Sequence, residues 1–190
     1  MFLVAGLGNP GTKYDGTRHN IGFEAADRLV QRYGLTPFKA WKGSHLSRGT
    51  ISGEDVLVIK PQTFMNLSGD AVGAAARYYH CEPANVVVIH DELDFEPGDF
   101  RLKSGGGHGG HNGLRSIMDH IGRDFTRIRV GIGKPPRGLG ADFVLSRFDK
   151  TSRELVDEVL EDVMEAVEGI ITKGVRGTMN TVNGRQSSSN

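Results

Sequence analysis

Two histidines and an asparagine stand in a loop that is otherwise built almost entirely of glycine. The stretch Ser104–Gly113 holds six of the 27 glycines of the chain, together with His108, His111 and Asn112. Glycine lets the backbone approach a ligand closely, and N–H groups at the start of a following helix can face an anion. We therefore expect a ligand site here, interpreted at first as a phosphate cradle with two catalytic histidines.

Histidines and carboxylates supply the groups that transfer protons near neutral pH. The strongest candidates are His19, His108, His111, Asp91 and Asp94. His19 precedes an expected helix, which it can also simply cap. The two aspartates follow a buried strand, where ligand crevices of α/β sheets lie. Packing or helix-end positions make the remaining candidates weaker: His45, His80, His90 and His120.

Three loop asparagines suit a design in which a histidine activates water directly. They are Asn9, Asn66 and Asn112. A neutral amide donates and accepts hydrogen bonds without attracting a metal. In such a site an aspartate fixes the tautomer of the histidine, and the amides hold a carbonyl and its developing oxyanion. Asn66 has the alternative role of capping the helix that follows it.

Other hydrolytic designs have less support. No G-x-S-x-G elbow occurs for a serine nucleophile, and Cys81 lacks a supporting glycine motif. His108 and His111 are spaced as H-x-x-H, but the H-E-x-x-H pattern of zinc hydrolases is absent. The Gly6–Gly11 turn fits neither the dinucleotide nor the P-loop spacing. A metal-dependent hydrolase that uses His108 and His111 stays open as an alternative.

Composition indicates a globular protein with an uneven charge distribution. The 190 residues fit one domain, and the lone cysteine excludes an intrachain disulfide. There is no apolar run of about 18 residues and no secretory leader, so we expect a cytoplasmic location without membrane attachment. Net charge is zero, but residues 101–150 carry ten Lys/Arg against four Asp/Glu, whereas residues 151–173 carry two against seven. A basic face that meets phosphates is one interpretation, and two ordinary solvated faces are the other.

The elements that must position these residues alternate between strands and helices. We expect a single α/β domain over residues 1–190, with a central mixed twisted sheet flanked by helices. Expected strands lie at 2–5, 44–51, 56–60, 86–89, around 101–103, and 125–132. Expected helices are one of about 12 residues that Gly34 ends, one at 67–80 capped by Asn66 or Ser68, one after Gly113, and one at 151–171.

The helix expected at 151–171 is amphipathic and lies near the C-terminus. Thr151 and Glu154 form a capping box for it. The tail from about residue 178 is polar and is expected to fray. The basic, Pro- and Gly-rich loop 134–140 is a candidate for movement. The apolar stripe of the helix consists of Leu155, Val159, Val163, Val167 and Ile170.

Five motifs, in order, resemble bacterial peptidyl-tRNA hydrolases. They lie at residues 6–14, 17–22, 63–69, 90–94 and 105–114, and weaker similarity continues to the end of the chain. Any one motif is modest support, but five in this order are specific. The resemblance implies an α/β fold and metal-independent hydrolysis, without a cofactor, of the ester that joins a peptide to the 3′ end of tRNA. It also implies a monomer that recycles tRNA from stalled translation, with peptidyl-tRNA as its partner and no obligate protein partner.

The resemblance also assigns roles to individual residues. His19 matches the catalytic base, and Asp91 matches the carboxylate that orients it. Asn9 and Asn66 match residues that place the peptide and the reacting ester, and Asn112 matches one that holds substrate or water. Matches with less defined roles are two positions lining the site, Tyr14 and Met65, and His111 at its rim.

The basic pair Lys103 and Arg129 matches residues that contact the 5′ phosphate of tRNA, in agreement with the positive bias of this region. On this basis the glycine loop becomes a wall of the cleft, and His108 becomes a packing residue. The rival from another class is an RNA-binding protein of the same fold that has lost hydrolysis. The sequence leaves open which asparagine contacts the oxyanion and how a free α-amine is rejected.

Overall fold

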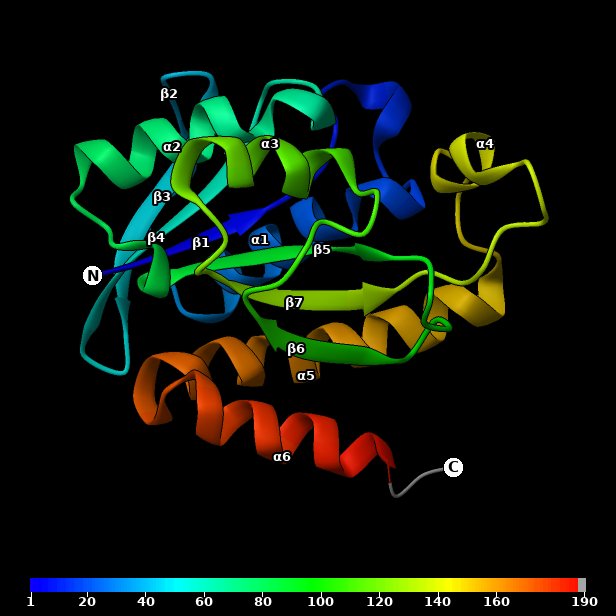
Figure 1. Cartoon of the computed structure of the whole chain (residues 1–190). Coiled ribbons are helices and arrows are strands. Elements are labelled where there is room, and N and C mark those ends of the chain that lie inside the picture. The colour runs from blue at the N-terminus through cyan, green and yellow to red at the C-terminus, as the bar shows by residue number, and fades with distance from the viewer. Residues whose placement is uncertain (188–190) are drawn as a thin grey trace.

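A seven-stranded mixed sheet forms the centre of the computed structural model, which describes residues 1–187 (Figure 1). The strand order is β2-β3-β4-β1-β5-β7-β6. Strands β4, β1, β5 and β7 run parallel, and β2, β3 and β6 join by antiparallel pairing. Their bounds are β1 Phe2–Gly6, β2 Lys39–Trp41, β3 Ser44–Ile51, β4 Glu54–Pro61, β5 Val86–Glu92, β6 Phe100–Ser104 and β7 Thr126–Gly131.

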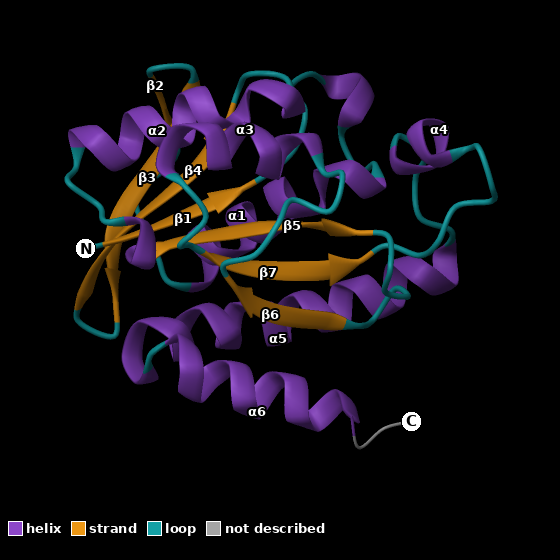
Figure 2. Cartoon of the chain, viewed as in Figure 1, coloured by secondary structure: helices purple, strands orange, loops and turns teal. Residues whose placement is uncertain are grey.

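Helices cover both faces of the sheet (Figure 2). Alternate strand residues point to opposite faces, so Val4 packs with α1 and α5 while Leu3 and Ala5 pack with α2 and α3. Each face therefore has its own apolar core. The short helix α4 and the C-terminal helix α6 complete the fold. The bounds are α1 Ile21–Arg32, α2 Ser68–Tyr78, α3 Asn112–Ile121, α4 Gly140–Val144, α5 Lys150–Lys173 and α6 Val175–Ser187.

The ends of β1 and β5 mark the point where the chain switches direction across the sheet. From β1 the chain crosses through α1 to strands on one side, and β5 lies on the other side of β1. Ligands of open α/β sheets bind outside the carboxyl ends of strands at such a point. Asp91 lies near the end of β5, so the topology alone places it at this crevice.

Two glycines let α1 sit directly against the end of β1. A Cβ on Gly6 would lie 2.1 Å from the carbonyl oxygen of Gly22, and one on Gly22 would lie 2.5 Å from that of Ile89. No larger residue fits at either position without moving backbone. This approach brings the turn before α1, residues Arg18–Asn20, to the end of β5.

The expected α/β class, the mixed sheet and the 44–61 hairpin are confirmed. The sequence missed the short strand β2. Of the tail that was expected to fray, residues 178–187 belong to α6, and residues 188–190 lie outside the described part. No helix among the described residues is long and apolar enough to span a membrane.

Three expected details of helix ends and faces are also wrong. The side chain of Asp149, not Thr151, caps α5 by accepting the N–H of Ser152 at 2.9 Å. Neither Asn66 nor Ser68 caps α2 through its side chain. Leu155 is 43% exposed, whereas the rest of the predicted stripe is buried.

Candidate active site

A cleft of about 670 Å³ opens at the carboxyl ends of β1 and β5. The glycine loop and the start of α3 form one wall, and α4 forms another. Seven of the residues predicted for the site line it together, although they come from six separate segments. They are Asn9, His19, Asp91, Lys103, His111, Asn112 and Arg129.

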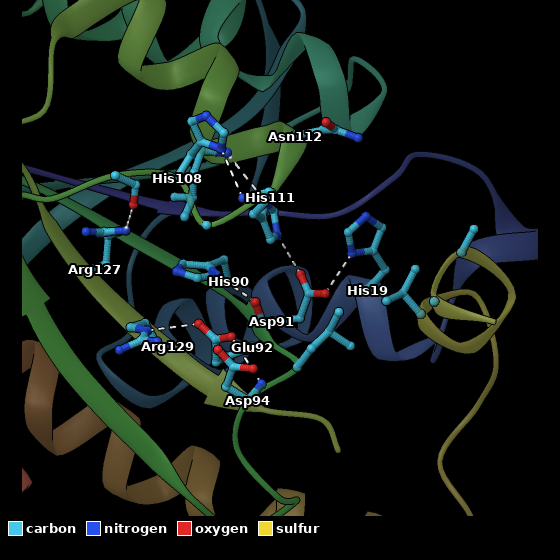
Figure 3. A pocket seen from close by; sticks show the side chains of 18 of the residues that line it. His19, His90, Asp91, Glu92, Asp94, His108, His111, Asn112, Arg127 and Arg129 are labelled. Carbon is cyan, nitrogen blue, oxygen red and sulfur yellow. Dashed lines mark hydrogen bonds and ion pairs between the residues drawn. The ribbon is translucent and has the colours of Figure 1, made fainter. Parts of the chain in front are cut away.

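Asp91 lies between two imidazoles, with one carboxylate oxygen directed at each (Figure 3). Its Oδ2 lies 2.9 Å from Nδ1 of His19, and its Oδ1 lies 2.8 Å from Nε2 of His111. His19 precedes α1 and His111 precedes α3, so the two histidines reach the strand end from helices on opposite faces of the sheet. Asp91 is 4% exposed, which shields both bonds from solvent.

The hydrogen-bond network assigns a proton to one nitrogen of each imidazole. Nδ1 of His111 accepts the backbone N–H groups of Gly113 and Leu114 at 3.2 and 3.3 Å, so it carries no proton. The proton of His111 is therefore on Nε2, which donates to Asp91. His19 likewise donates from Nδ1, which leaves its Nε2 as a free base toward the cleft.

Burial and the charges of the site act in opposite directions on the pKa of His19 and on that of Asp91. Burial works to lower the pKa of His19, but the charge of Asp91 and the hydrogen bond to it outweigh burial and raise that pKa above 6.5. Burial works to raise the pKa of Asp91, but His111 and His19 hold it far below its usual range. Asp91 is therefore ionised whenever His19 is active.

His90 is a third histidine at the cleft, and the sequence made it a weaker candidate for proton transfer. It is 2% exposed, and its Nδ1 donates to the backbone carbonyl of Asp91 at 2.7 Å. Burial, with the neighbouring His111 as the next cause, lowers the pKa of His90 to about 3. Its ring packs edge-on against that of His111, with centroids 4.9 Å apart. His90 is thus a neutral support beneath His111.

Asn9 is held so that only its amino group is left for a ligand. Its Oδ1 accepts the backbone N–H of Met65 at 2.8 Å. The side chain of Asn20 makes two hydrogen bonds to the backbone of Asn9: its Oδ1 accepts the N–H of Asn9 at 2.8 Å, and its Nδ2 donates to the carbonyl of Asn9 at 2.9 Å. Asn9 lines the cleft, so its NH₂ group is a fixed donor there.

The glycine loop is held from below by Arg127. This arginine is 3% exposed, and its guanidinium donates to the carbonyl oxygens of Gly105 and of Gly107, the latter at 2.7 Å. The loop leads into Asn112, the first residue of α3, which is exposed at the cleft. The side chain of Asn112 makes no hydrogen bond within the described residues, so its amide is available to a ligand.

The basic side of the cleft lies on β6 and β7. Lys103 is exposed, and Nε of Arg129 lies 2.9 Å from a carboxylate oxygen of Glu92. Phe95 stacks under Arg129, with the guanidinium 4.7 Å from the ring centroid. Lys103 and Arg127 face each other across the two strands. Positive charge is therefore concentrated beside the glycine loop, as the sequence indicated.

Three residues predicted for the site do not line the cleft. Met65 is 5% exposed and packs in the core against the start of α3, where a Cβ on Gly113 would lie 2.6 Å from its sulfur. Tyr14 lies in the turn Thr12–Tyr14, with Lys13 over its ring. Asn66 is exposed in the turn Met65–Leu67.

His108 lines the cleft as well, and its Nδ1 accepts the N–H of Gly110 at 3.0 Å. This bond supports the loop, in line with the packing role expected for His108.

The supporting residues Asn20 and Arg127 were not identified from the sequence. Asn20 lies beside His19 in the 17–22 motif, and that position was the available clue.

Within the part of the chain that the structure describes, one group of three side chains is close enough to hold a metal ion. The ligand atoms of His19, Asp91 and His111 all lie within 4.8 Å of one another. The same nitrogens donate to Asp91, so a bound ion would replace both hydrogen bonds. Among the described residues His108 belongs to no such group, so the pair proposed from the H-x-x-H spacing, His108 and His111, is not brought together as a metal site.

Comparison with known proteins is consistent from sequence to structure. The sequence model described as Peptidyl-tRNA hydrolase matches residues 3–190. The chain is 47% identical to the peptidyl-tRNA hydrolase of Ruegeria sp. over 96% of its own length and 74% of that protein. It is 51% identical to that of Rhodospirillum centenum over 85% and 71%. The crystal structure of the Acinetobacter baumannii peptidyl-tRNA hydrolase superposes with a TM-score of 0.92 at 40% identity, covering 96% of this chain and 94% of that one.

Proposed function

The chain belongs to the peptidyl-tRNA hydrolase family, whose members are ester hydrolases that act on peptidyl-tRNA, and from this we propose that His19 is the general base of that reaction. The observation that carries the proposal is the bond from Nδ1 of His19 to Asp91, because it leaves Nε2 unprotonated at the cleft. Asp91 raises the pKa of His19 against the opposing effect of burial, which makes Nε2 a stronger base for taking a proton from water.

In the proposed reaction Nε2 of His19 takes a proton from water, and the water oxygen attacks the ester carbonyl. The carbonyl oxygen becomes an oxyanion, to which the NH₂ groups of Asn9 and Asn112 can donate. Collapse of the tetrahedral intermediate breaks the bond to the 3′ oxygen of tRNA, which receives the proton from the His19 imidazolium. The products are a free peptide and a tRNA with its hydroxyl restored.

Asp91 and His111 orient His19 without touching the substrate themselves in the proposed reaction. The carboxylate fixes the tautomer and ring orientation of His19 and stabilises its charged form. His111 occupies the second oxygen of that carboxylate and therefore sets its rotation. Because His111 is also tied to the first turn of α3, the base, the carboxylate and the wall that carries Asn112 form one connected unit.

Lys103 and Arg129 are proposed to bind the phosphate at the 5′ end of the tRNA. Both line the basic side of the same cleft. Contacts to phosphate carry no base code, which suits an enzyme that must accept every tRNA. The proposed setting is the cytoplasm, where such an enzyme recycles tRNA from abandoned translation as a monomer, without a metal or an obligate protein partner.

Hydrolysis of peptidyl-tRNA in EDTA tests this function and separates it from both rivals. The purified protein should release peptide from an N-blocked peptidyl-tRNA at the same rate with and without chelator, and should spare an aminoacyl-tRNA with a free α-amine. Loss of activity in EDTA that zinc restores would support a metal-dependent hydrolase instead. Binding of tRNA without peptide release would identify an RNA-binding protein.

A further inference from the structure

Arg18, the residue before the proposed base, is a buried cation held against two aromatic rings. It is 8% exposed, and its guanidinium carbon lies 4.4 Å from the ring centroid of Phe143 and 4.7 Å from that of Phe148. A planar guanidinium can stack on aromatic rings and still donate in its own plane, which an ammonium group cannot do. The site is therefore specific for arginine.

Hydrogen bonds also join the turn that contains Arg18 to residues 132–147, the part of the chain that carries Phe143. Nη1 of Arg18 donates to the carbonyl of Ile132 at 2.8 Å, and Nε donates to Oγ of Ser146 at 3.3 Å. The backbone N–H of Arg18 donates to the carbonyl of Ser146 at 2.9 Å. Thr17 forms an isolated β-bridge with Arg147. Segments 128 residues apart in the sequence are thus joined through side chain and backbone.

The segment that Arg18 grips continues directly into a wall of the cleft. Residues 140, 141, 144 and 145 line the cleft opposite the glycine loop, and Phe143 lies among them. Arg18 is also the direct neighbour of His19 in the helical turn Arg18–Asn20. If the wall formed by residues 140–145 moved relative to His19, the contacts of Arg18 would have to change.

We propose that Arg18 is a positioning residue that holds the α4 wall of the cleft, residues 140–145, in register with His19. The inference rests on the proposed role of His19 as the base. Substrate lying against the wall is then presented to Nε2 of His19 at a fixed distance. The distance matters because misplacement of a reacting group by about 1 Å can cost on the order of a hundredfold in rate.

Substitution of Arg18 by lysine keeps the charge but removes the stack and the forked donors. We expect kcat to fall about tenfold, with KM rising because the wall is no longer held. The pH midpoint of kcat/KM should stay at the wild-type value, since the bond from His19 to Asp91 is untouched. The matched control is Arg153→Lys, because Arg153 also lies over Phe148, at 5.2 Å, but pairs with Glu24 and Asp157 instead. This control should keep wild-type kcat and KM per folded molecule.

A double-mutant cycle with Leu145 separates positioning from a merely structural role. Leu145 is 43% exposed and lines the cleft, so Leu145→Ala should raise KM severalfold by itself. In the Arg18→Lys background the same change should have little further effect, because the wall is already released. The proposal would be overturned if the double variant lost kcat/KM by the product of the two single effects. It would also be overturned if Arg18→Lys kept the wild-type kcat and KM.

A second variant covers the case in which Arg18→Lys does not fold. Phe143→Leu removes one ring that stacks on Arg18 and leaves the hydrogen bonds of Arg18 in place. Combined with Leu145→Ala, it should lower kcat/KM by less than the product of the two single effects. A loss equal to that product would contradict the inference. These outcomes leave the assignment of His19 intact, because that assignment depends on His19 and Asp91 variants and on wild-type hydrolysis.

Discussion

His111 donates from Nε2 to Oδ1 of Asp91 over 2.8 Å while its Nδ1 caps α3. This relationship fixes which carboxylate oxygen remains for His19. Both ring nitrogens of His111 are therefore engaged, Nε2 by Asp91 and Nδ1 by the N–H groups of Gly113 and Leu114. The two histidines that flank Asp91 are not equivalent, because of these two only His19 keeps a ring nitrogen, Nε2, without a partner among the described residues.

Asp91→Asn should inactivate the enzyme through a change of tautomer. An asparagine has one acceptor and one donor where Asp91 has two acceptors, so it cannot satisfy both imidazoles as they stand. His111 is fixed by its cap and keeps the oxygen, and His19 then faces an NH₂ group and moves its proton to Nε2. We expect kcat to fall about 10²–10⁴-fold, with tRNA affinity retained. Steady-state kinetics with an independent binding assay check this, and a loss below fivefold would count against it.

The pH dependence of kcat/KM should report His19. The base form is the active one, so activity should be low in acid and rise as pH passes the pKa of His19. Asp91 raises that pKa, so the midpoint should lie above 6.5. His90, with a pKa of about 3, should contribute nothing to the profile. A midpoint below 6.5 would show that burial outweighs the carboxylate.

His111 should be needed for both stability and turnover, and two variants separate these roles. His111→Ala removes a helix cap and one partner of a buried carboxylate, so unfolding free energy should fall by about 1–3 kcal/mol. His111→Asn can still cap α3 but is too short to reach Asp91, so it should recover the part of the stability that the cap contributes, and not kcat. His120→Ala, on the same helix but paired with Asp70 and not with Asp91, is the control for the kinetics. Full activity in His111→Asn would refute the orienting role.

Lys103→Ala should weaken tRNA binding and reduce its dependence on salt. Loss of one phosphate contact should lower the slope of log K against log salt by about one unit. Arg129→Ala should weaken binding further, because it also leaves Glu92 unpaired beside the phosphate. Lys39→Ala, on the opposite edge strand of the sheet, should change neither slope nor affinity. A lower kcat with unchanged affinity and slope would contradict the phosphate role.

The sequence predicted elements whose pattern is local. Residues 86–89 form a run of β-branched side chains, and the 44–61 hairpin has a short polar turn, so both were found. The strand at 39–41 has too few residues to show a pattern. Helix α6 is polar, and it is held by contacts far along the chain: Asn183 bonds both backbone groups of Leu102 at 3.0 Å. The cap at Asp149 was a local pattern and was overlooked.

The members of the site were predictable, but their connections were not. His19, Asp91 and the asparagines lie in recognisable motifs, and the fold brings most of them to one cleft. The bond from His111 to Asp91 joins residues 20 apart on different elements, and Arg18 contacts a segment far along the chain. Such pairs depend on how helices dock on the sheet, which no local spacing records. Met65, which was expected to line the cleft, is buried in the core instead.

The most direct test of the central claim is single-turnover hydrolysis of peptidyl-tRNA by His19→Ala. The variant loses the base while Asp91 keeps its bond to His111, so the fold and tRNA affinity should persist. The account predicts that peptide release falls at least a hundredfold, on the order expected for loss of a general base. Release at close to the wild-type rate, from protein that binds tRNA normally, would show that His19 is not the base.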